Sequence, residues 1–448
     1  MNKDKIPKIK PELGGGLRDY LPKDMIPRQK ILDTIRGVFE SFGFLPIDTP
    51  AIEKKVILTG GDPEFKKQLF EIKSPDGEGD LALRFDLTVP LARVVSAYPN
   101  EIKKPFKRYQ VGKVFRGERS QAGRFKEFLQ FDADIVGAPS VLADAEIVVL
   151  MNETLTRLGV KNFLIRINNR KILNGLAEFA GFKEEKTGEV LRAIDKLDRD
   201  GWSSVEKDLS IKLKSKDSIK AIKEFINLSI SGEPLVRAGK IMKKSPTASM
   251  GVEELERISG YLKAYGIPEK NWKIDFSVAR GLGYYTGPVF EAVLKDLPQI
   301  GSIFSGGRYD DLVARFGGQT IPATGASVGV DRLFAAIEKL GLVDSQTSIA
   351  KVIVLNFDEN CVEYVAEITA KLRRAGIATN LYLGQEKSLK GQLAYAISEG
   401  YEYVVLAGSE EKSSAKVQVK NIKLRTQTTV SLKDIEKGIV INTKINLS

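Results

Sequence analysis

The sequence predicts an α+β fold, in which an antiparallel sheet is interrupted by a helical segment and followed by a smaller α/β domain. Three observations predict this fold. Residues 113–137 read as two strands folded back on each other across a polar turn bounded by glycines. Residues 170–265 are dominated by the helical spacing of apolar side chains. Residues 351–408 alternate strand and helix, which is typical of a mostly parallel sheet with helices on both faces.

The second strand of the hairpin, Phe128–Val136, has one polar and one apolar face. Side chains two residues apart share a face of a strand, so the polar face carries Phe128, Gln130, Asp132 and Asp134. The turn before it carries Arg116, Glu118, Arg119 and Arg124. The planar guanidinium group suits phosphate, because it donates two parallel hydrogen bonds. An exposed hairpin with a solvated charged tip has the same pattern, and these residues alone do not decide between the two readings.

Two later stretches also place an arginine beside glycines, where the backbone can approach a ligand closely. One is SVARGLGYYTGPVFE at Ser277–Glu291. The other is GASVGVDRL at Gly325–Leu333, preceded by SGGRYDDL at Ser305–Leu312. Three such constellations in one chain predict a site for a polyphosphate.

These stretches carry a family resemblance. FRGERSQAGRFKEFLQFDADIVG resembles motif 2 of the class II aminoacyl-tRNA synthetases, and GASVGVDRL resembles motif 3. ARGLGYYTGPVFE and SGGRYDDL are similar to the two signature peptides of the histidyl-tRNA synthetase family. The resemblance covers almost the whole chain. It implies a class II catalytic core at residues 1–169 and 266–340, a helical insertion domain at 170–265, a linker at 341–350 and an anticodon-binding α/β domain at 351–448.

The resemblance implies a ligase that activates L-histidine with ATP and then transfers histidine from the adenylate to the 3′ end of tRNA(His), for translation. ATP is expected as a substrate and Mg²⁺ on its phosphates, although the metal ligands are not assigned. The segment Asp24–Pro50 resembles motif 1, which in the family builds a homodimer. Without a long apolar run or an apolar N-terminal core, we expect no membrane span, no secretory leader and a cytoplasmic location.

Matching the motifs residue by residue assigns expected roles. Arg280 and Arg116 are the expected catalytic cations, with Arg116 on the α-phosphate. The expected histidine-binding residues are Asp86, Thr88, Gln130, Asp134, Tyr284, Tyr285 and Tyr309. The expected ATP-binding residues are Arg116, Glu118, Arg124 and Arg332, and Gln121 is expected near the tRNA acceptor end. In commoner family patterns Gly117 is a histidine, Ser120 a proline and Gly283 an acid, so we expect local changes there.

Composition limits the chemistry. The chain has 448 residues, a net charge of +11, one cysteine and no histidine. This excludes Ser-His-Asp catalysis, histidine metal ligands and an internal disulfide. The lack of histidine has two explanations that one sequence does not separate: drift or engineering, and avoidance of histidine in an enzyme that supplies it to translation. A non-catalytic regulator of ATP phosphoribosyltransferase has the same fold, but generally lacks the C-terminal domain and part of the active site. A mere tRNA-binding module would leave an ATP pocket unexplained.

The remaining elements of the first 340 residues follow from local patterns. The expected helices are Asp24–Phe42, Leu91–Tyr98, Val141–Leu158 and Asp331–Leu340. The expected strands are Phe44–Ile47, Lys113–Phe115, Leu81–Pro90, Phe163–Ile167, Lys273–Val278, Val289–Leu294 and Ile303–Ser305.

The first prediction concerns Arg280. Negative charge gathers on the α-phosphate as the histidine carboxylate approaches, so a fixed cation there stabilises mainly the transition state. We expect Arg280→Gln to lower the rate of histidyl-adenylate formation by orders of magnitude, with substrate KM values and Tm little changed. A structural arginine paired with Asp275 or Glu291 would instead lower Tm and cause a modest, general loss of activity.

Overall fold

The computed structural model describes residues 9–60, 69–73, 77, 79–117, 125–230, 232–279, 284–343 and 348–439. The chain divides into two compact units, residues 1–18 with 31–342 and residues 19–30 with 343–448. No helix among the described residues combines the length and the apolar run that a bilayer crossing needs.

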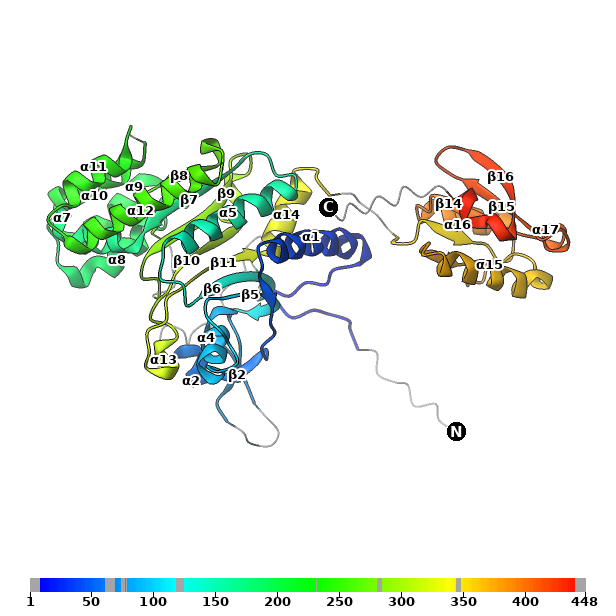
Figure 1. Cartoon of the computed structure of the whole chain (residues 1–448), viewed down its shortest axis with the longest axis horizontal. Coiled ribbons are helices and arrows are strands. Elements are labelled where there is room, and N and C mark those ends of the chain that lie inside the picture. The colour runs from blue at the N-terminus through cyan, green and yellow to red at the C-terminus, as the bar shows by residue number, and fades with distance from the viewer. Residues whose placement is uncertain are drawn as a thin grey trace. The chain divides into compact units, whose positions relative to one another are not determined.

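In the described part of the first unit, eight strands form one sheet in the order β1-β5-β6-β11-β10-β9-β7-β8 (Figure 1). Their bounds are β1 Leu45–Pro46, β5 Phe106–Phe115, β6 Glu127–Val136, β7 Phe163–Asn169, β8 Trp272–Ile274, β9 Pro288–Leu294, β10 Phe304–Arg308 and β11 Ala323–Gly329. The β1–β5 and β7–β8 pairs are parallel and the other pairs are antiparallel. The predicted antiparallel-sheet core is therefore confirmed. However, β5 begins at Phe106, well before the predicted Lys113.

The two faces of this sheet differ as the two-residue period of β6 predicts. On one face, Phe39 of helix α1 (Pro22–Ser41) packs against Phe131, with ring centroids 4.9 Å apart, and against Tyr109 of β5. Helix α5 (Leu142–Arg157) covers the same face, where its buried Asp144 pairs with Arg308. Aromatic packing removes apolar area from water and fixes α1 on the sheet. The opposite face, with Asp132 and Asp134, is left for the site.

A second, three-stranded sheet lies in the same unit and runs in the order β2-β4-β3. Its strands are β2 Ile52–Lys54, β3 Phe70–Ile72 and β4 Leu81–Leu83, and nearby helices are α2 Lys55–Thr59, α4 Thr88–Ala97 and α13 Ala314–Gly317. The predicted strand Leu81–Pro90 was wrong beyond Leu83, since Thr88 begins α4. The Asp86 carboxylate accepts a hydrogen bond from the Val89 N–H at 3.1 Å. Pro90 falls in the first helical turn, where its missing N–H costs nothing.

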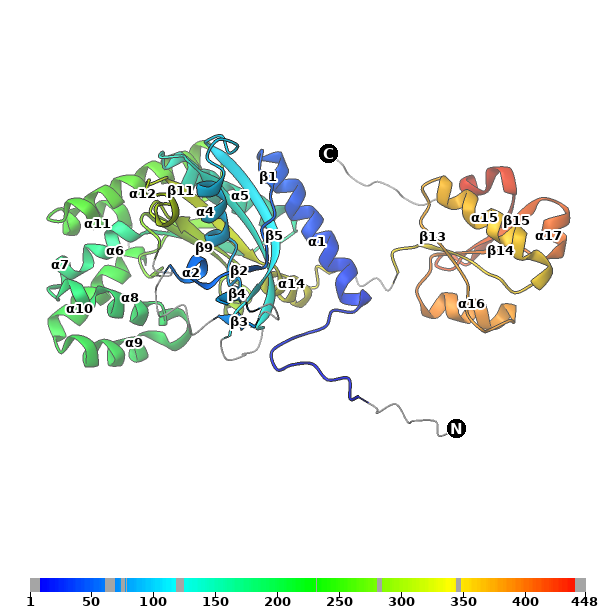
Figure 2. The ribbon, with the colours of Figure 1, turned by 90° about the horizontal axis from the view of Figure 1, so that it is seen from below.

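The segment from Arg170 to Ala264 is helical, as its spacing predicts. Its helices are α6 Arg170–Asn174, α7 Leu176–Ala180, α8 Thr187–Ile194, α9 Leu197–Leu213, α10 Lys216–Asn227, α11 Pro234–Met242 and α12 Pro246–Ala264. Ser215 and Ser245 cap α10 and α12 by accepting N–H bonds from Ser218 and Ala248. Figure 2 shows these helices gathered beside one end of the large sheet. That they act as a separate insertion domain remains a prediction.

After the helical segment, the chain returns to the large sheet and then forms helix α14 (Val330–Lys339). The bounds of α14 are close to those of the predicted helix Asp331–Leu340. Asp331 at its start accepts a hydrogen bond from the backbone N–H of Leu129 at 2.7 Å. This bond ties the helix of the predicted motif 3 to the strand of the predicted motif 2.

The described part of the second unit contains a five-stranded sheet in the order β13-β12-β14-β15-β16. The strands are β12 Val352–Val354, β13 Thr379–Leu381, β14 Tyr403–Leu406, β15 Lys416–Asn421 and β16 Thr426–Ser431, and the helices are α15 Val362–Arg374, α16 Leu389–Ser398 and α17 Ser409–Ser413. The core has two sides: Ile368 of α15 packs on one face of the sheet and Ala396 of α16 on the other. Helices on both faces are thus confirmed.

The strands of residues 351–408 are parallel, as predicted, but strands from beyond that range make the sheet of the second unit mixed. Strands β13, β12 and β14 are parallel, but β15 and β16 are antiparallel to their neighbours. The missed strand β16 is exposed along almost its whole length. It therefore lacks the apolar signal by which strands are recognised in a sequence.

The two-sided core of the second unit generates a prediction. Because the catalytic sheet lies wholly in the first unit, we expect removal of residues 345–448 to spare histidyl-adenylate formation better than transfer to tRNA. ATP–pyrophosphate exchange and aminoacylation are measured on the truncated and full-length chains after circular dichroism has shown both to be folded. Equal loss of both activities in a folded truncation contradicts this division of labour.

Candidate active site

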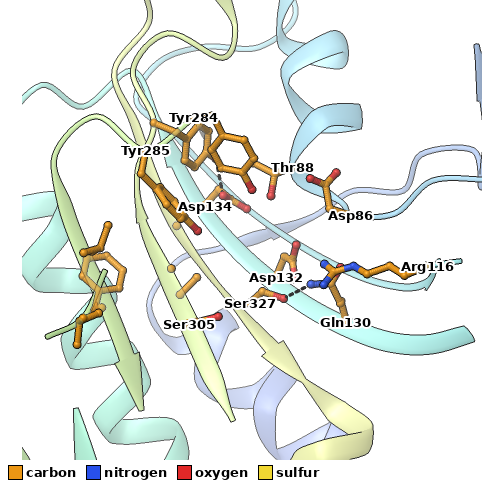
Figure 3. Close-up of a pocket in the computed structure, with 17 residues that line it drawn as sticks. Asp86, Thr88, Arg116, Gln130, Asp132, Asp134, Tyr284, Tyr285, Ser305 and Ser327 are labelled. Carbon is orange, nitrogen blue, oxygen red and sulfur yellow. Dashed lines mark hydrogen bonds between the residues drawn. The ribbon is translucent and has the colours of Figure 1, made fainter. Parts of the chain in front are cut away.

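A cavity of about 200 Å³ opens on the polar face of the large sheet. Figure 3 shows Tyr284 and Tyr285 on one side of it, Asp86 and Thr88 from the segment after β4 on another, and Arg116 at the end of β5. The residues lining it are Asp86, Thr88, Arg116, Gln130, Asp132, Asp134, Val278, Tyr284, Tyr285, Val289, Phe290, Ser305, Gly306, Tyr309, Gly325, Ala326 and Ser327. Drug-sized ligands occupy pockets of roughly 300–1,000 Å³, so this volume suits a ligand of amino-acid size.

Asp134 lines the cavity beside Tyr284 and Tyr285 (Figure 3) and is held on both oxygens. The register places Arg108 of β5 beside it, with Arg108 Nη2 2.6 Å from Asp134 Oδ2. The Tyr309 hydroxyl donates a hydrogen bond to Oδ1. Both charged side chains are buried. Burial raises the pKa of Asp134, while Arg108 and Tyr309 oppose that shift.

Gly325 of β11 pairs with Asp134 across the sheet. A Cβ atom at position 325 would lie 2.0 Å from Asp134 Oδ1, a distance no real side chain tolerates. The first glycine of GASVGVDRL therefore makes room for the carboxylate that forms the cavity floor. Its role differs from the close approach to a ligand that the sequence pattern predicts.

Two further carboxylates, Asp86 and Asp132, carry raised pKa values. Burial raises the pKa of Asp132 to about 7, and the positive charge of Arg108 opposes the shift while the Asp134 carboxylate adds to it. Burial raises the pKa of Asp86 to about 6 against the Val89 N–H and Arg116. Removing a carboxylate from water disfavours its charged form. A cationic ligand would therefore supply the charge that these acids lack.

Several buried polar atoms of cavity-lining residues, and of Arg108 beside Asp134, have no hydrogen-bond partner among the described residues. They are Asp86 Oδ2, Asp132 Oδ1, Gln130 Oε1 and the Nε and Nη1 atoms of Arg108. The Gln130 side chain forms a hydrogen bond only through its amide N–H, which donates to Ser327 Oγ at 2.7 Å (Figure 3). Unpartnered buried polar atoms cost free energy. Their concentration around one cavity indicates a polar ligand that completes the bonding.

The arginine side of the cavity is formed by Arg116. Its Nε donates to the Phe85 carbonyl at 3.1 Å, and its guanidinium lies 5.1 Å from the centroid of the Phe128 ring. These contacts orient a cation toward the cavity by cation–π packing and one backbone bond. The cavity therefore joins an acidic floor to a basic wall, a charge pattern that suits a zwitterion next to a phosphate.

Three tyrosines close the remaining side. The ring of Tyr284 lies 5.0 Å from that of Tyr285 and 6.0 Å from that of Tyr309, both edge-on. Burial raises the pKa of each phenol above its usual value. All three hydroxyls stay protonated at neutral pH and can act as hydrogen-bond donors.

The structure brings most of the predicted site residues together. Eight of them line the cavity: Asp86, Thr88, Arg116, Gln130, Asp134, Tyr284, Tyr285 and Tyr309. Arg332 does not line it; its Nη1 donates to the Ser302 carbonyl at 2.7 Å. Arg280, Glu118, Gln121 and Arg124 lie outside the described residues, as do Gly283 and Ser120. Gly117 is exposed beyond the end of β5.

The sequence reading left out Asp132, Arg108, Ser305 and Ser327. Asp132 lies on the strand face that was recognised as polar, so the two-residue period already contained its signal. Ser305 begins the stretch SGGRYDDL and Ser327 lies in GASVGVDRL, and the two are opposite each other in the β10–β11 pair. Arg108 was missed because β5 was expected to begin only at Lys113, and no pairing with Asp134 follows from that shorter strand.

Comparison with known proteins gives a consistent picture. The family model described as histidyl-tRNA synthetase matches residues 16–333, and the anticodon binding domain model matches residues 351–441. The histidine–tRNA ligase of Clostridium tetani is 42% identical, over 96% of this chain and 98% of that protein. That of Wolinella succinogenes is 41% identical, over 92% and 94%. The crystal structure of histidyl-tRNA synthetase from Nostoc sp. PCC 7120 superposes with a TM-score of 0.85 at 31% identity, covering 96% of this chain and 100% of that one.

The raised pKa of Asp132 generates a prediction about stability. The folded protein binds more protons than the unfolded chain between pH about 4 and about 7, so this group makes the ligand-free protein less stable as pH rises. The difference between the ordinary pKa of an aspartate and about 7 corresponds to about 4 kcal/mol at most. We expect Asp132→Asn to raise Tm at pH 8, with the gain shrinking toward pH 4. Thermal melts across pH test this, with the exposed Asp311→Asn as control; a gain independent of pH contradicts it.

Proposed function

Because this chain belongs to the histidyl-tRNA synthetase family, we propose that the cavity beside Asp134 is where it binds histidine and the α-phosphate of ATP. The chain is an aminoacyl-tRNA synthetase, a ligase that joins L-histidine to tRNA(His) with ATP as substrate. The observation that carries the proposal is one cavity lined by three buried acids and one arginine, with several polar atoms left without partners.

The first step forms histidyl-adenylate. A carboxylate oxygen of histidine attacks the α-phosphorus of ATP, the bond to the bridging oxygen of the β-phosphate breaks, and diphosphate leaves. This step requires alignment and charge stabilisation more than a base. Arg116, fixed by Phe85 and Phe128, is the proposed α-phosphate ligand, and Arg280 the proposed bridging cation.

Histidine selection is proposed to use the acidic floor. Asp86, Thr88 and Gln130 would hold the ammonium group, because Oδ2 of Asp86 and Oε1 of Gln130 are buried without partners among the described residues. Asp134 and Tyr285 would face the imidazole, while Arg108 and Tyr309 fix the Asp134 carboxylate in place. A site built to hydrogen-bond a substrate group rejects analogues that lack that group. Tyr284 lines the same side.

The other end of ATP is proposed to contact Glu118, Arg124 and Arg332, as the motif match implies. Mg²⁺ is proposed to arrive on the ATP phosphates. Mg²⁺ commonly binds through substrate phosphates and few protein ligands. The metal, when bound, would neutralise phosphate charge.

The second step transfers the histidyl group to a hydroxyl of the terminal ribose of tRNA, and AMP leaves. Gln121 is proposed to lie near the acceptor end, and residues 351–448 to bind the anticodon.

A homodimer through residues 24–50 is also proposed, since β1 is a sheet edge and Leu45 within it is 58% exposed. Light scattering at micromolar concentration tests it, and a fully active monomer refutes it. A cytoplasmic location completes the proposal.

ATP–pyrophosphate exchange with each of the twenty amino acids tests the proposed function. Exchange that depends on histidine alone is expected. A chain that binds tRNA but exchanges with no amino acid would be a non-catalytic regulator or a binding module, and the proposal would be wrong.

The proposed contact of Asp134 with the imidazole generates a prediction. We expect Asp134→Asn to raise the KM for histidine by about 10- to 150-fold, since a hydrogen bond to a charged group contributes roughly 1.5–3 kcal/mol. The KM for ATP should change much less. Tyr309→Phe is the matched variant, because it removes a support of the carboxylate but keeps the charge, and it should have a smaller effect. A raised KM for ATP with unchanged histidine discrimination contradicts the assignment.

A further inference from the structure

Residues 275–278 follow β8, and Val278 at the end of this segment lines the cavity. This segment is held from the sheet side by two side chains of β7. Arg166 contacts Asp275 and Ser277, and the Asn168 amide donates to the carbonyls of Phe276 and Val278 at 3.2 and 3.0 Å. The position of the cavity wall therefore depends on β7.

The planar guanidinium group of Arg166 contacts several side chains at once. Nε donates to Asp275 Oδ2 at 2.8 Å, and Nη2 donates to Ser277 Oγ at 2.6 Å. Nη1 is shared by Glu291 Oε1, at 3.1 Å, and Asp198 Oδ2. The Arg166, Asp275 and Glu291 side chains are all at least 90% buried. Because the guanidinium is planar, a change at Nη1 turns the whole group and moves Nη2.

The helical segment, residues 170–264, also contacts residues 275–278 and Arg166. Asp198 lies in α9, and its side chain is 49% exposed, unlike the other partners of Arg166. The Ser229 hydroxyl accepts the Phe276 N–H at 2.8 Å, and the ring of Phe225 in α10 packs 5.0 Å from that of Phe276. Asp198 is thus the solvent-accessible member of an otherwise buried charge cluster that supports the wall.

We propose that Asp198 is a positioning residue for adenylate formation. By fixing Nη1 of Arg166, Asp198 sets the positions of Ser277 and Val278. The rate of adenylate formation in the cavity therefore depends on how the helical segment packs against the sheet. Without Asp198, Nη1 is left to Glu291 alone, and the fork is free to rotate away from Ser277. The charges around Arg166 explain why this costs little stability. Asp275 and Glu291 still neutralise Arg166, with Lys273 2.7 Å from Asp275.

The proposal rests on the proposed placement of adenylation in the cavity, and Asp198→Asn tests it. We expect kcat for histidine-dependent ATP–pyrophosphate exchange to fall at least about five-fold, the low end of coupling between separate sites in proteins. KM for both substrates and Tm should change little, and Asp198→Glu should restore part of the rate. The control is Asp200→Asn in the same helix, since Asp200 pairs with Arg199 instead. It should leave kcat unchanged.

A double-mutant cycle with Ser277→Ala separates coupling from two independent effects. If Asp198 acts through Arg166 on Ser277, the double variant should be no slower than the slower single variant. The proposal is overturned if the kcat losses of the two single variants multiply in the double variant. It is also overturned if kcat is unchanged in Asp198→Asn, or if Asp200→Asn lowers kcat by as much. An absence of histidine-dependent exchange in the unaltered chain would instead overturn the proposed function.

Discussion

The pair formed by Arg108 and Asp134 is the interaction on which the cavity depends. Both side chains are removed from water, where an isolated charge is strongly disfavoured. Each charge is tolerable only because the β5–β6 register brings the other within 2.6 Å. Gly325 leaves space for the carboxylate on the next strand, and Tyr309 fixes its second oxygen. The sheet register, Gly325 of the predicted motif 3 and Tyr309 thus all meet at one carboxylate.

The buried acids that would bind the substrate lower the stability of the ligand-free protein. Asp86 and Asp132 stand near Asp134 with one buried arginine between them and raised pKa values. An apolar lining would make the empty protein more stable, but it would not select an ammonium group and an imidazole. The aromatic packing of Phe39 on the opposite face of the same sheet stabilises the strands that bear the acids. One face of β6 therefore supports the fold and the other serves the site.

The sequence was most informative where a short period decides orientation. The alternation in Phe128–Val136 correctly separated the polar face from the apolar face, because adjacent strand residues point in opposite directions. It was least informative where a partner decides the outcome. Strand β16 has no apolar signal and exists because it pairs with β15. Arg108 shows nothing in sequence that distinguishes it from a surface arginine, and only the register with Asp134 reveals its role. The roles of Arg280 and the turn residues rest on motif similarity alone.

The absence of histidine from the chain has a spectroscopic consequence. The bound substrate carries the only histidine side chain in the complex, so no imidazole signal of the protein can be mistaken for that of the ligand. In most proteins, a titration between pH 5 and 8 belongs first to histidine side chains. Here it reports on the buried aspartates, among them Asp86 and Asp132 of the cavity, and on the substrate ring. The ionisation state of the ligand inside its own synthetase thereby becomes directly measurable.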